Sequence, residues 1–190
     1  MCTKEDEKIL TIYNNEGLSI SSMARITGIS KSNVVNKIRK LGQKIIKPNV
    51  AEEQKEYEVD EMTAIIGRRQ EPHYIIYAIN RKTKCVMDFI IGRRTKENIK
   101  VVTSRIMTLN PKKVLTDGLN IYPGLIPEPV HKVSNHGINR IERNNLTLRM
   151  QLKRLGRKTI CFSRSTEMLE SSLKIYFWGC KNHYSPSSVL

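Results

Sequence analysis

Three acidic residues stand in segments whose patterns could place them around divalent cations. Asp60 lies inside the alternating stretch Tyr-Glu-Val-Asp-Glu-Met, and Asp117 ends the strand-like run Lys-Val-Leu-Thr-Asp. Glu142 lies in the helix-like segment Asn-Arg-Ile-Glu-Arg-Asn-Asn-Leu. Carboxylates from separate elements supply the hard oxygen ligands that Mg²⁺ takes, and paired ions can support chemistry at phosphorus. We therefore predict that Asp60, Asp117 and Glu142 bind two Mg²⁺ or Mn²⁺ ions and are catalytic.

The charge of the chain indicates what such ions would act on. The sequence holds 33 Lys and Arg against 18 Asp and Glu, a formal net charge of +15. Basic residues are concentrated between positions 140 and 164, around and after Glu142. A basic surface attracts the phosphates of nucleic acid. We therefore expect a polyanion as the partner, and the helix-turn-helix pattern described below favours double-stranded DNA.

A membrane partner is disfavoured. Membrane binding would favour a basic amphipathic helix with bulky aromatic side chains on its other face, and only 6% of the residues are aromatic. No run approaches the roughly 20 apolar residues of a membrane span. The first residues, Met-Cys-Thr-Lys-Glu-Asp-Glu-Lys, lack the apolar core of a signal peptide. We expect a cytoplasmic, nucleoid-associated protein.

The cysteines give no sign of a metal centre. None of the four forms a Cys-x-x-Cys pair, so we expect no zinc in this chain. A reducing compartment disfavours disulfides, and the sequence predicts free thiols. These cysteines are Cys2, Cys85, Cys161 and Cys180.

The elements that must position the three acids follow from the hydrophobic patterns. Strands are predicted at 57–66, 73–79, 84–91, 112–116 and 129–133. Helices are predicted at 95–108, 138–155 and 166–178, with a short helix or loop at 119–126. This order gives three antiparallel strands followed by βαβ crossovers, which make a mixed sheet with helices on its faces. It resembles the RNase H-like fold, in which acids lie on the first strand, at the end of the fourth and on a late helix.

The N-terminal segment resembles a helix-turn-helix. A helix is predicted at 4–16, and 19–41 then reads as two helices around a tight turn at Gly28, where a positive φ costs little. A plain three-helix packing unit is the alternative interpretation. The basic, Asn-bearing second helix favours DNA binding. The residues predicted to face DNA are Lys31, Ser32, Asn33, Asn36 and Lys37.

Three parts of the chain follow from these patterns. We predict an all-α helix-turn-helix domain at 1–50, an α/β catalytic domain at 56–180 and a disordered tail at 181–190. The acidic residue Glu61 neighbours Asp60, and strand alternation puts it on the opposite face of the strand. We therefore expect Glu61 to be solvated or salt-bridged.

The helix that carries Glu142 also carries groups that could hold phosphates. Arg149 follows Glu142 by two helical turns, so both side chains project from the same face. Asn139 lies one turn before Glu142 and could orient that carboxylate or bind the DNA backbone. A solvated helix face is the alternative for the basic run that follows. The residues predicted to grip DNA here are Asn139, Arg149, Lys153 and Arg157.

With these residues, the chain resembles a DDE transposase of the bacterial insertion-sequence-one family. The likeness rests on 57–62, on Thr-Asp-Gly-Leu-Asn-Ile-Tyr-Pro (116–123) and above all on the block 139–165. It implies a catalytic triad of Asp60, Asp117 and Glu142, with a helix-turn-helix that binds the terminal inverted repeats. It also implies an upstream Cys-rich zinc-binding segment, which this sequence does not carry, so we expect a truncated or minimal version. Thr63 stands where the family pattern suggests an aromatic residue.

The resemblance implies DNA transposition. Such an enzyme cleaves at the element's ends and transfers the freed 3′-hydroxyl into target DNA, acting on DNA as a dimer or larger assembly. A truncated, non-catalytic repressor of its own element is the alternative, and a general RNase H-like nuclease without strand transfer is a third.

Overall fold

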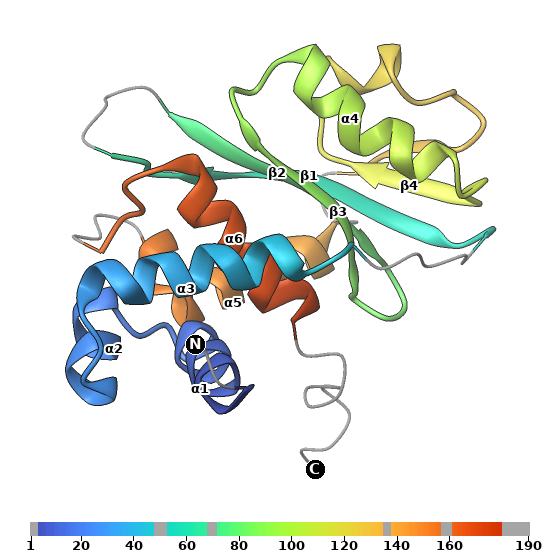
Figure 1. Ribbon diagram of the computed structural model, residues 1–190. Helices are drawn as coiled ribbons and strands as arrows, with labels where there is room; N and C mark the ends of the chain where they lie inside the picture. The colour runs from blue at the N-terminus through green and yellow to red at the C-terminus, as the bar shows by residue number, and fades with distance from the viewer. Residues whose placement is uncertain (1–3, 48–52, 68–71, 135–137, 157–160, 180–190) are drawn as a thin grey trace. The chain divides into compact units, whose positions relative to one another are not determined.

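The computed structural model describes residues 4–47, 53–67, 72–134, 138–156 and 161–179. The chain divides into two compact units (Figure 1). The first joins residues 1–47 to residues 151–190, and the second holds residues 48–150. Arg157, the tail at 181–190, Cys2 and Cys180 lie outside the described residues. Cys85 and Cys161 are free thiols.

The second unit is built on a five-stranded mixed sheet of order β3-β2-β1-β4-β5. Strand β1 pairs antiparallel with β2, and β2 pairs antiparallel with β3. Strand β4 is parallel to both β1 and β5. The mixed sheet predicted from the sequence is confirmed, and its order is consistent with an RNase H-like arrangement. The strands are β1 (Glu56–Ala64), β2 (His73–Asn80), β3 (Val86–Gly92), β4 (Lys113–Thr116) and β5 (His131–Val133).

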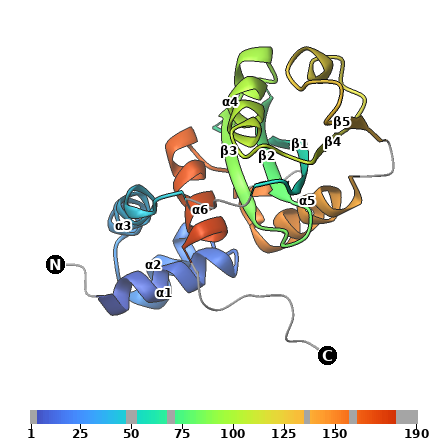
Figure 2. The same ribbon diagram turned by 90° about the vertical axis from the view of Figure 1, so that its right-hand side faces the viewer.

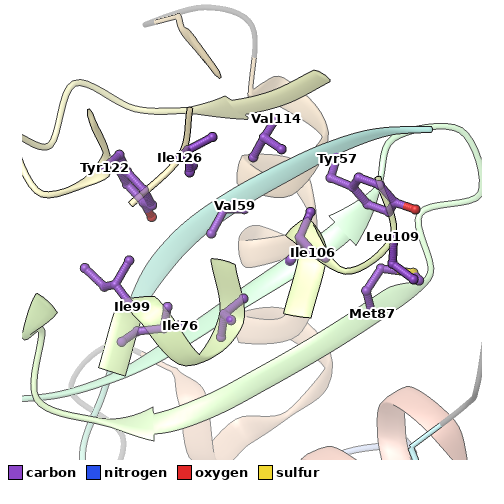
Figure 3. Packing of buried hydrophobic residues seen from close by; sticks show 12 residues of the cluster. Tyr57, Val59, Ile76, Met87, Ile99, Ile106, Leu109, Val114, Tyr122 and Ile126 are labelled. Carbon is purple, nitrogen blue, oxygen red and sulfur yellow. The ribbon is translucent and has the colours of Figure 1, made fainter. Parts of the chain in front are cut away.

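Two helices cover opposite faces of this sheet (Figure 2). Helix α4 (Lys96–Met107) begins at Thr95, whose side chain accepts a hydrogen bond from the Asn98 N–H, as an N-cap does. Its residues Ile99 and Ile106 are fully buried against Val59 of β1 (Figure 3). Helix α5 (Asn139–Gln151) lies on the other face. The sheet is therefore buried on both sides, as a parallel crossover sheet requires.

A buried carboxylate ties α5 to the first strand. Glu58 is fully buried on β1. One of its oxygens accepts the Ile141 N–H at 2.9 Å, and the other accepts Arg81 Nε at 3.0 Å. A carboxylate at a helix N-terminus satisfies a free N–H and meets the positive end of the helix dipole. Glu58 therefore fixes the start of the helix that carries Glu142.

The first unit is helical. Its helices are α1 (Lys4–Asn15), α2 (Ile20–Thr27), α3 (Lys31–Lys44) and α6 (Thr166–Trp178). Ser19 and Ser30 cap α2 and α3, and Gly28 between them has φ +68, as the sequence predicts. The helices share one apolar core, whose buried members include Leu10, Met23, Val34, Ile38, Leu41, Met168 and Ile175.

Helix α6 crosses α3 and packs against it in this unit (Figure 1). A Cβ at Gly42 would lie 2.5 Å from the Ser171 Cα, so only glycine allows the two helices to approach this closely. The sequence prediction placed 166–178 with the sheet, whereas α6 packs against α1 and α3. Which segments fold independently stays a prediction, and so does the assignment of α2 and α3 as a DNA-binding helix-turn-helix.

The predicted helix 138–155 is shorter than expected. Helix α5 ends at Gln151, Leu152 is extended with φ −96 and ψ 93, and a 3-10 turn follows at Lys153–Leu155. Leu152 and Leu155 are both buried. The hydrophobic spacing does not account for the break, because Leu152 and Leu155 follow the buried Leu148 at i+4 and i+7, which is the same face of a continued helix. Lys153 consequently lies outside the helix that carries Glu142. Among the described helices, none is long and apolar enough to cross a membrane.

Candidate active site

Three carboxylates meet in the second unit, at the point where β4 ends beside β1. Ligand atoms of Asp60, Glu61 and Asp117 all lie within 4.8 Å of one another. Asp60 and Glu61 are on β1, and Asp117 directly follows β4. The last parallel pair between these strands is Glu58 with Leu115, so β1 continues past the end of β4. Beyond that pair, β1 is not hydrogen-bonded to β4. Side chains from both faces of β1 can therefore approach Asp117.

Asp60 is oriented by two hydrogen bonds. One oxygen accepts the Glu61 backbone N–H at 2.8 Å, and the other accepts Asn145 Nδ2 of α5 at 2.7 Å. Burial raises the pKa of Asp60 to about 6, the two hydrogen bonds oppose this, and the charges of Asp117 and Glu142 add to it. The hydrogen bonds therefore fix the orientation of the Asp60 carboxylate, and a cation beside it would stabilise its ionised form.

Glu61 corrects a sequence-based prediction. It was expected to be solvated or salt-bridged, yet it is half-buried and accepts the Tyr122 hydroxyl at 2.5 Å. Burial is the main cause that raises the pKa of Glu61 to about 7, and the charges of Asp117 and Asp60 raise it further. Strand alternation assigned its face correctly. It did not reveal that this face ends beside Asp117.

Asp117 is held by the turn that follows β4. Its carboxylate accepts the Leu119 N–H at 3.0 Å. The preceding residue, Thr116, is fully buried, and its hydroxyl lies 2.8 Å from His131 Nε2 on β5. Burial lowers the pKa of His131, which favours the neutral ring at this position. The end of β4 is therefore fixed from both sides.

Glu142 lies on α5 but outside the three-carboxylate cluster. Its side chain is exposed, and its charge contributes to the raised pKa of Asp60. Farther along the helix, Arg149 Nη2 donates to the Thr63 hydroxyl at 3.1 Å. The structure therefore brings Asp60 and Asp117 together and places Glu142 within electrostatic reach of them.

The donor set fits a divalent cation. Three carboxylates this close repel one another, and two of them have raised pKa values. A hard cation with oxygen ligands relieves that repulsion. The Asn145 and Tyr122 hydrogen bonds resemble the outer partners that orient metal ligands.

The residues predicted to bind DNA fall in different places. Lys31, Ser32 and Asn36 of α3 line a cavity of the first unit together with Lys153. Asn33 is exposed and Lys37 half-buried, and neither lines that cavity. Asn139 is exposed at the first turn of α5 in the second unit, and Arg149 contacts β1 in the same unit.

Sequence reasoning missed three residues of the site. Glu61 was placed elsewhere, and Asn145 and Tyr122 were not considered. Asn145 lies one turn after Glu142, so the same helix periodicity that predicts Arg149 could have indicated it. Tyr122 begins a 3-10 turn (Tyr122–Gly124) inside the segment 119–126 predicted as a short helix or loop, and no pattern there predicts the direction of its side chain.

Comparison with known proteins decides the family. The family model described as IS1 transposase matches residues 56–184. This chain belongs to the IS1 transposase family. The insertion element iso-IS1n protein InsB of Shigella dysenteriae is 39% identical over 113 residues, which are 60% of this chain and 86% of that protein. The IS1 protein InsB of Shigella flexneri is 31% identical over 119 residues, or 63% of this chain and 91% of that protein.

Two further comparisons extend this result. The IS1 2 protein InsB of Escherichia coli (strain K12) is 32% identical over 119 residues, which cover 63% of this chain and 71% of that protein. Among solved structures, a chain of the simian T-cell lymphotropic virus intasome in complex with the PP2A regulatory subunit B56 gamma has 11% identity and a TM-score of 0.45. That match covers 92% of this IS1 family member and 69% of the other chain, and a score this low does not establish a common fold.

Proposed function

We propose that this IS1 family member is a DNA transposase that cleaves at the ends of its insertion element and transfers the 3′-hydroxyl into target DNA. The proposal rests chiefly on the meeting of Asp60 and Asp117, from two strands far apart in sequence, within one cluster of ligand atoms. Family membership and the net charge of +15 agree with a DNA substrate.

Asp60 and Asp117 would be the shared metal ligands. Bound divalent cations would supply an activated water or hydroxyl and neutralise charge that develops on the phosphate. Asn145 and the Glu61 N–H hold the Asp60 carboxylate in one orientation. Glu142 would complete the ligand set from α5, and Glu61 would be a further carboxylate of the same site. The protein thereby contributes positioning and electrostatics and needs no protein nucleophile.

DNA contacts are proposed for both units. Arg149 would hold a phosphate near the carboxylates from its position on α5, and Asn139 would contact the backbone at the start of that helix. Residues Lys31, Ser32, Asn33, Asn36 and Lys37 of α3, with Lys153 and Arg157, would bind the terminal inverted repeats. Cutting two ends together would need at least a dimer on DNA, and such binding would keep the protein with the nucleoid.

The test uses the full chain and linear DNA that carries the inverted repeats of its element. We expect Asp60→Asn, Asp117→Asn and Glu142→Gln each to lower Mg²⁺-dependent cleavage and joining by at least about 100-fold, because each removes a charge from the reacting centre. Binding of the same DNA, measured by fluorescence anisotropy, should persist in all three variants.

Glu97→Gln is the matched control, because Glu97 is an exposed carboxylate on the first turn of α4 in the same unit. It should cleave and join at the wild-type rate. Near-normal joining by any of the three site variants would contradict the triad. DNA binding by the wild type in Mg²⁺ and in Mn²⁺ without cleavage would favour the repressor, and cleavage without joining would favour a simple nuclease.

A further inference from the structure

A basic cavity lies within the first unit. It has a volume of about 750 Å³. Its walls come from α2, α3, the segment around Lys153 and the residues before α6. Among the described residues that line it, none is acidic. The basic lining residues are Lys31, Arg39, Lys153, Arg154 and Arg164.

Arg154 is the unusual member of this set. Arg154 is only 8% exposed, and its Nη1 donates to the Ser163 hydroxyl at 3.2 Å. In the part of the chain that the structure describes, no carboxylate lies at ion-pair distance from this guanidinium. Burial lowers the pKa of Arg154, which shows the cost of keeping its charge there. Buried charges in folded proteins are normally paired or bound to a ligand.

The other basic residues of the cavity differ from Arg154 in their partners. Arg39 Nη2 donates to the Ser165 hydroxyl at 3.3 Å, and its Nε lies 3.3 Å from the Glu167 carboxylate. Lys31, Lys153 and Arg164 are exposed, so water can solvate their charges. The counter-charge is therefore missing chiefly at Arg154, inside the cavity.

Helix ends in the wall add to the positive field. The lining includes Ser19, Ile20 and Ser21 at the start of α2, and Lys31 and Ser32 at the start of α3. Ser165, the N-cap of α6, also lines it. Helix N-termini carry partial positive charge and free N–H groups that bind anions. Three helix starts and an unpaired buried guanidinium thus face one cavity.

We propose that this cavity binds a backbone phosphate of DNA, with Arg154 as the buried contact and Arg164 as a second contact at the surface. The proposal rests on the proposed DNA binding and assigns it a new site. Contacts to phosphate fix the position of a protein on the duplex without reading its sequence. The segment after α5 would thereby act with α2 and α3, and the phosphate would supply the charge that Arg154 lacks.

The experiment measures how DNA affinity depends on salt for Arg154→Met and Arg164→Met. Each variant should reduce the slope of log affinity against log salt by about 0.9, the value for one lost phosphate contact on duplex DNA. Between 50 and 200 mM salt, the wild type should then lose about 3.5-fold more affinity than either variant. Lys174→Met is the matched control, because Lys174 pairs with Glu170 on α6 and does not line the cavity.

Thermal unfolding of the free protein separates a ligand contact from a structural one. Arg154→Met removes an unpaired buried charge and should raise the unfolding midpoint by about 3 °C. A lowered midpoint, together with a wild-type salt slope for Arg164→Met, would overturn the proposal. Stabilisation of the wild type by inorganic phosphate, with unchanged slopes in both folded variants, would assign the cavity to a free anion and also overturn it.

Joining is measured on the same preparations. Absent joining by the wild type, with reduced slopes in both cavity variants, would contradict the proposed transposition chemistry and support the cavity. Wild-type slopes in both variants, with normal joining, would contradict the cavity alone.

Discussion

Each unit of the chain holds a local cluster of like charges, and the two clusters are of opposite sign. In the second unit, Asp60, Glu61 and Asp117 bring three carboxylates within 4.8 Å. In the first unit, Arg154 lies buried in a cavity whose described lining is basic and neutral. Each site costs stability in the isolated protein, and each would be relieved by a partner of the other sign. Substrate DNA and divalent cations together would satisfy both.

The two sites also differ in how they are built. Asp60 and Glu61 lie inside β1 and Asp117 directly follows β4, in a sheet covered on both faces, where register and backbone pairing determine their positions. The basic cavity is assembled from helix starts and an irregular segment. Precise placement suits bond cleavage, whereas a broad positive surface suits a backbone phosphate, whose contact needs less exact geometry.

Removing α6 should have the largest effect on stability, and that effect should be confined to the first unit. A chain that ends at Gly156 loses Met168 and Ile175 from the core shared with α1–α3. Losing two such side chains costs about 4–10 kcal/mol, comparable to the whole stability of a typical domain. We expect α3 to lose its protection from amide hydrogen exchange while β1 and β2 keep theirs. Retained protection in α3 would show that the N-terminal helices fold alone, as the predicted 1–50 domain requires.

The second unit should respond to pH and cations. The pKa values of Asp60 and Glu61 are raised in the folded protein to about 6 and about 7. At these two carboxylates the folded state binds more protons than the unfolded state, so their contribution to the free energy of unfolding falls as pH rises from about 4 to about 7. Because both groups are partly exposed, we expect a loss of about 1–2 kcal/mol in all. Urea unfolding in EDTA measures it.

Mg²⁺ should reverse this loss above pH 7, because cation binding favours the ionised carboxylates. Asp60→Asn and Glu61→Gln should each flatten the pH dependence. A free energy of unfolding that rises between pH 4 and 7 in EDTA would mean that these carboxylates are not destabilised by burial.

Tyr122→Phe tests one hydrogen bond of the cluster. The Tyr122 hydroxyl donates to Glu61, and its loss leaves a half-buried carboxylate with one donor fewer. We expect a loss of about 1 kcal/mol at pH 8 and less at pH 6, where Glu61 is largely protonated. Urea unfolding at the two pH values checks this. Tyr74→Phe, on β2 of the same unit, is the control, and an equal loss in both variants would contradict a role for the Glu61 contact.

Thr63→Val should have the smallest effect. Arg149 Nη2 donates to the Thr63 hydroxyl, which orients the arginine beside β1. Losing this exposed hydrogen bond should cost under about 1 kcal/mol in stability. We expect joining to slow a few-fold, with the Km for DNA raised more than kcat is lowered, because a phosphate contact is loosened. Thr63→Ser keeps the hydroxyl and should restore both values.

Sequence patterns predicted the local secondary structure well, and they predicted less well which side chains meet at the carboxylate cluster. The alternation of 57–62 and the helical spacing of 95–108 gave β1 and α4, because these periods reflect which face is buried. The position of Asp117 at a strand end also followed from the pattern. The approach of Glu61 to Asp117 did not, because it depends on where β4 stops relative to β1, and register is a tertiary property.

The break at Leu152 was missed for a similar reason. Residues 138–155 are polar and basic enough to continue a helix, and nothing local stops it before Gly156. Leu152 and Leu155 even continue the spacing of the buried Leu148, so the local pattern predicts a continuous helix and only the tertiary structure shows the break. This break moves Lys153 and Arg154 out of the helix that carries Glu142.

The order of synthesis gives the packing of α6 a further meaning. Residues 48–150 emerge from the ribosome before 166–178, so the sheet can fold while α3 still lacks the helix that packs beside Gly42. We expect the N-terminal helices to become stable last, once nearly the whole chain has been made. An incomplete product of interrupted translation would then lack the folded first unit on which the proposed DNA binding depends.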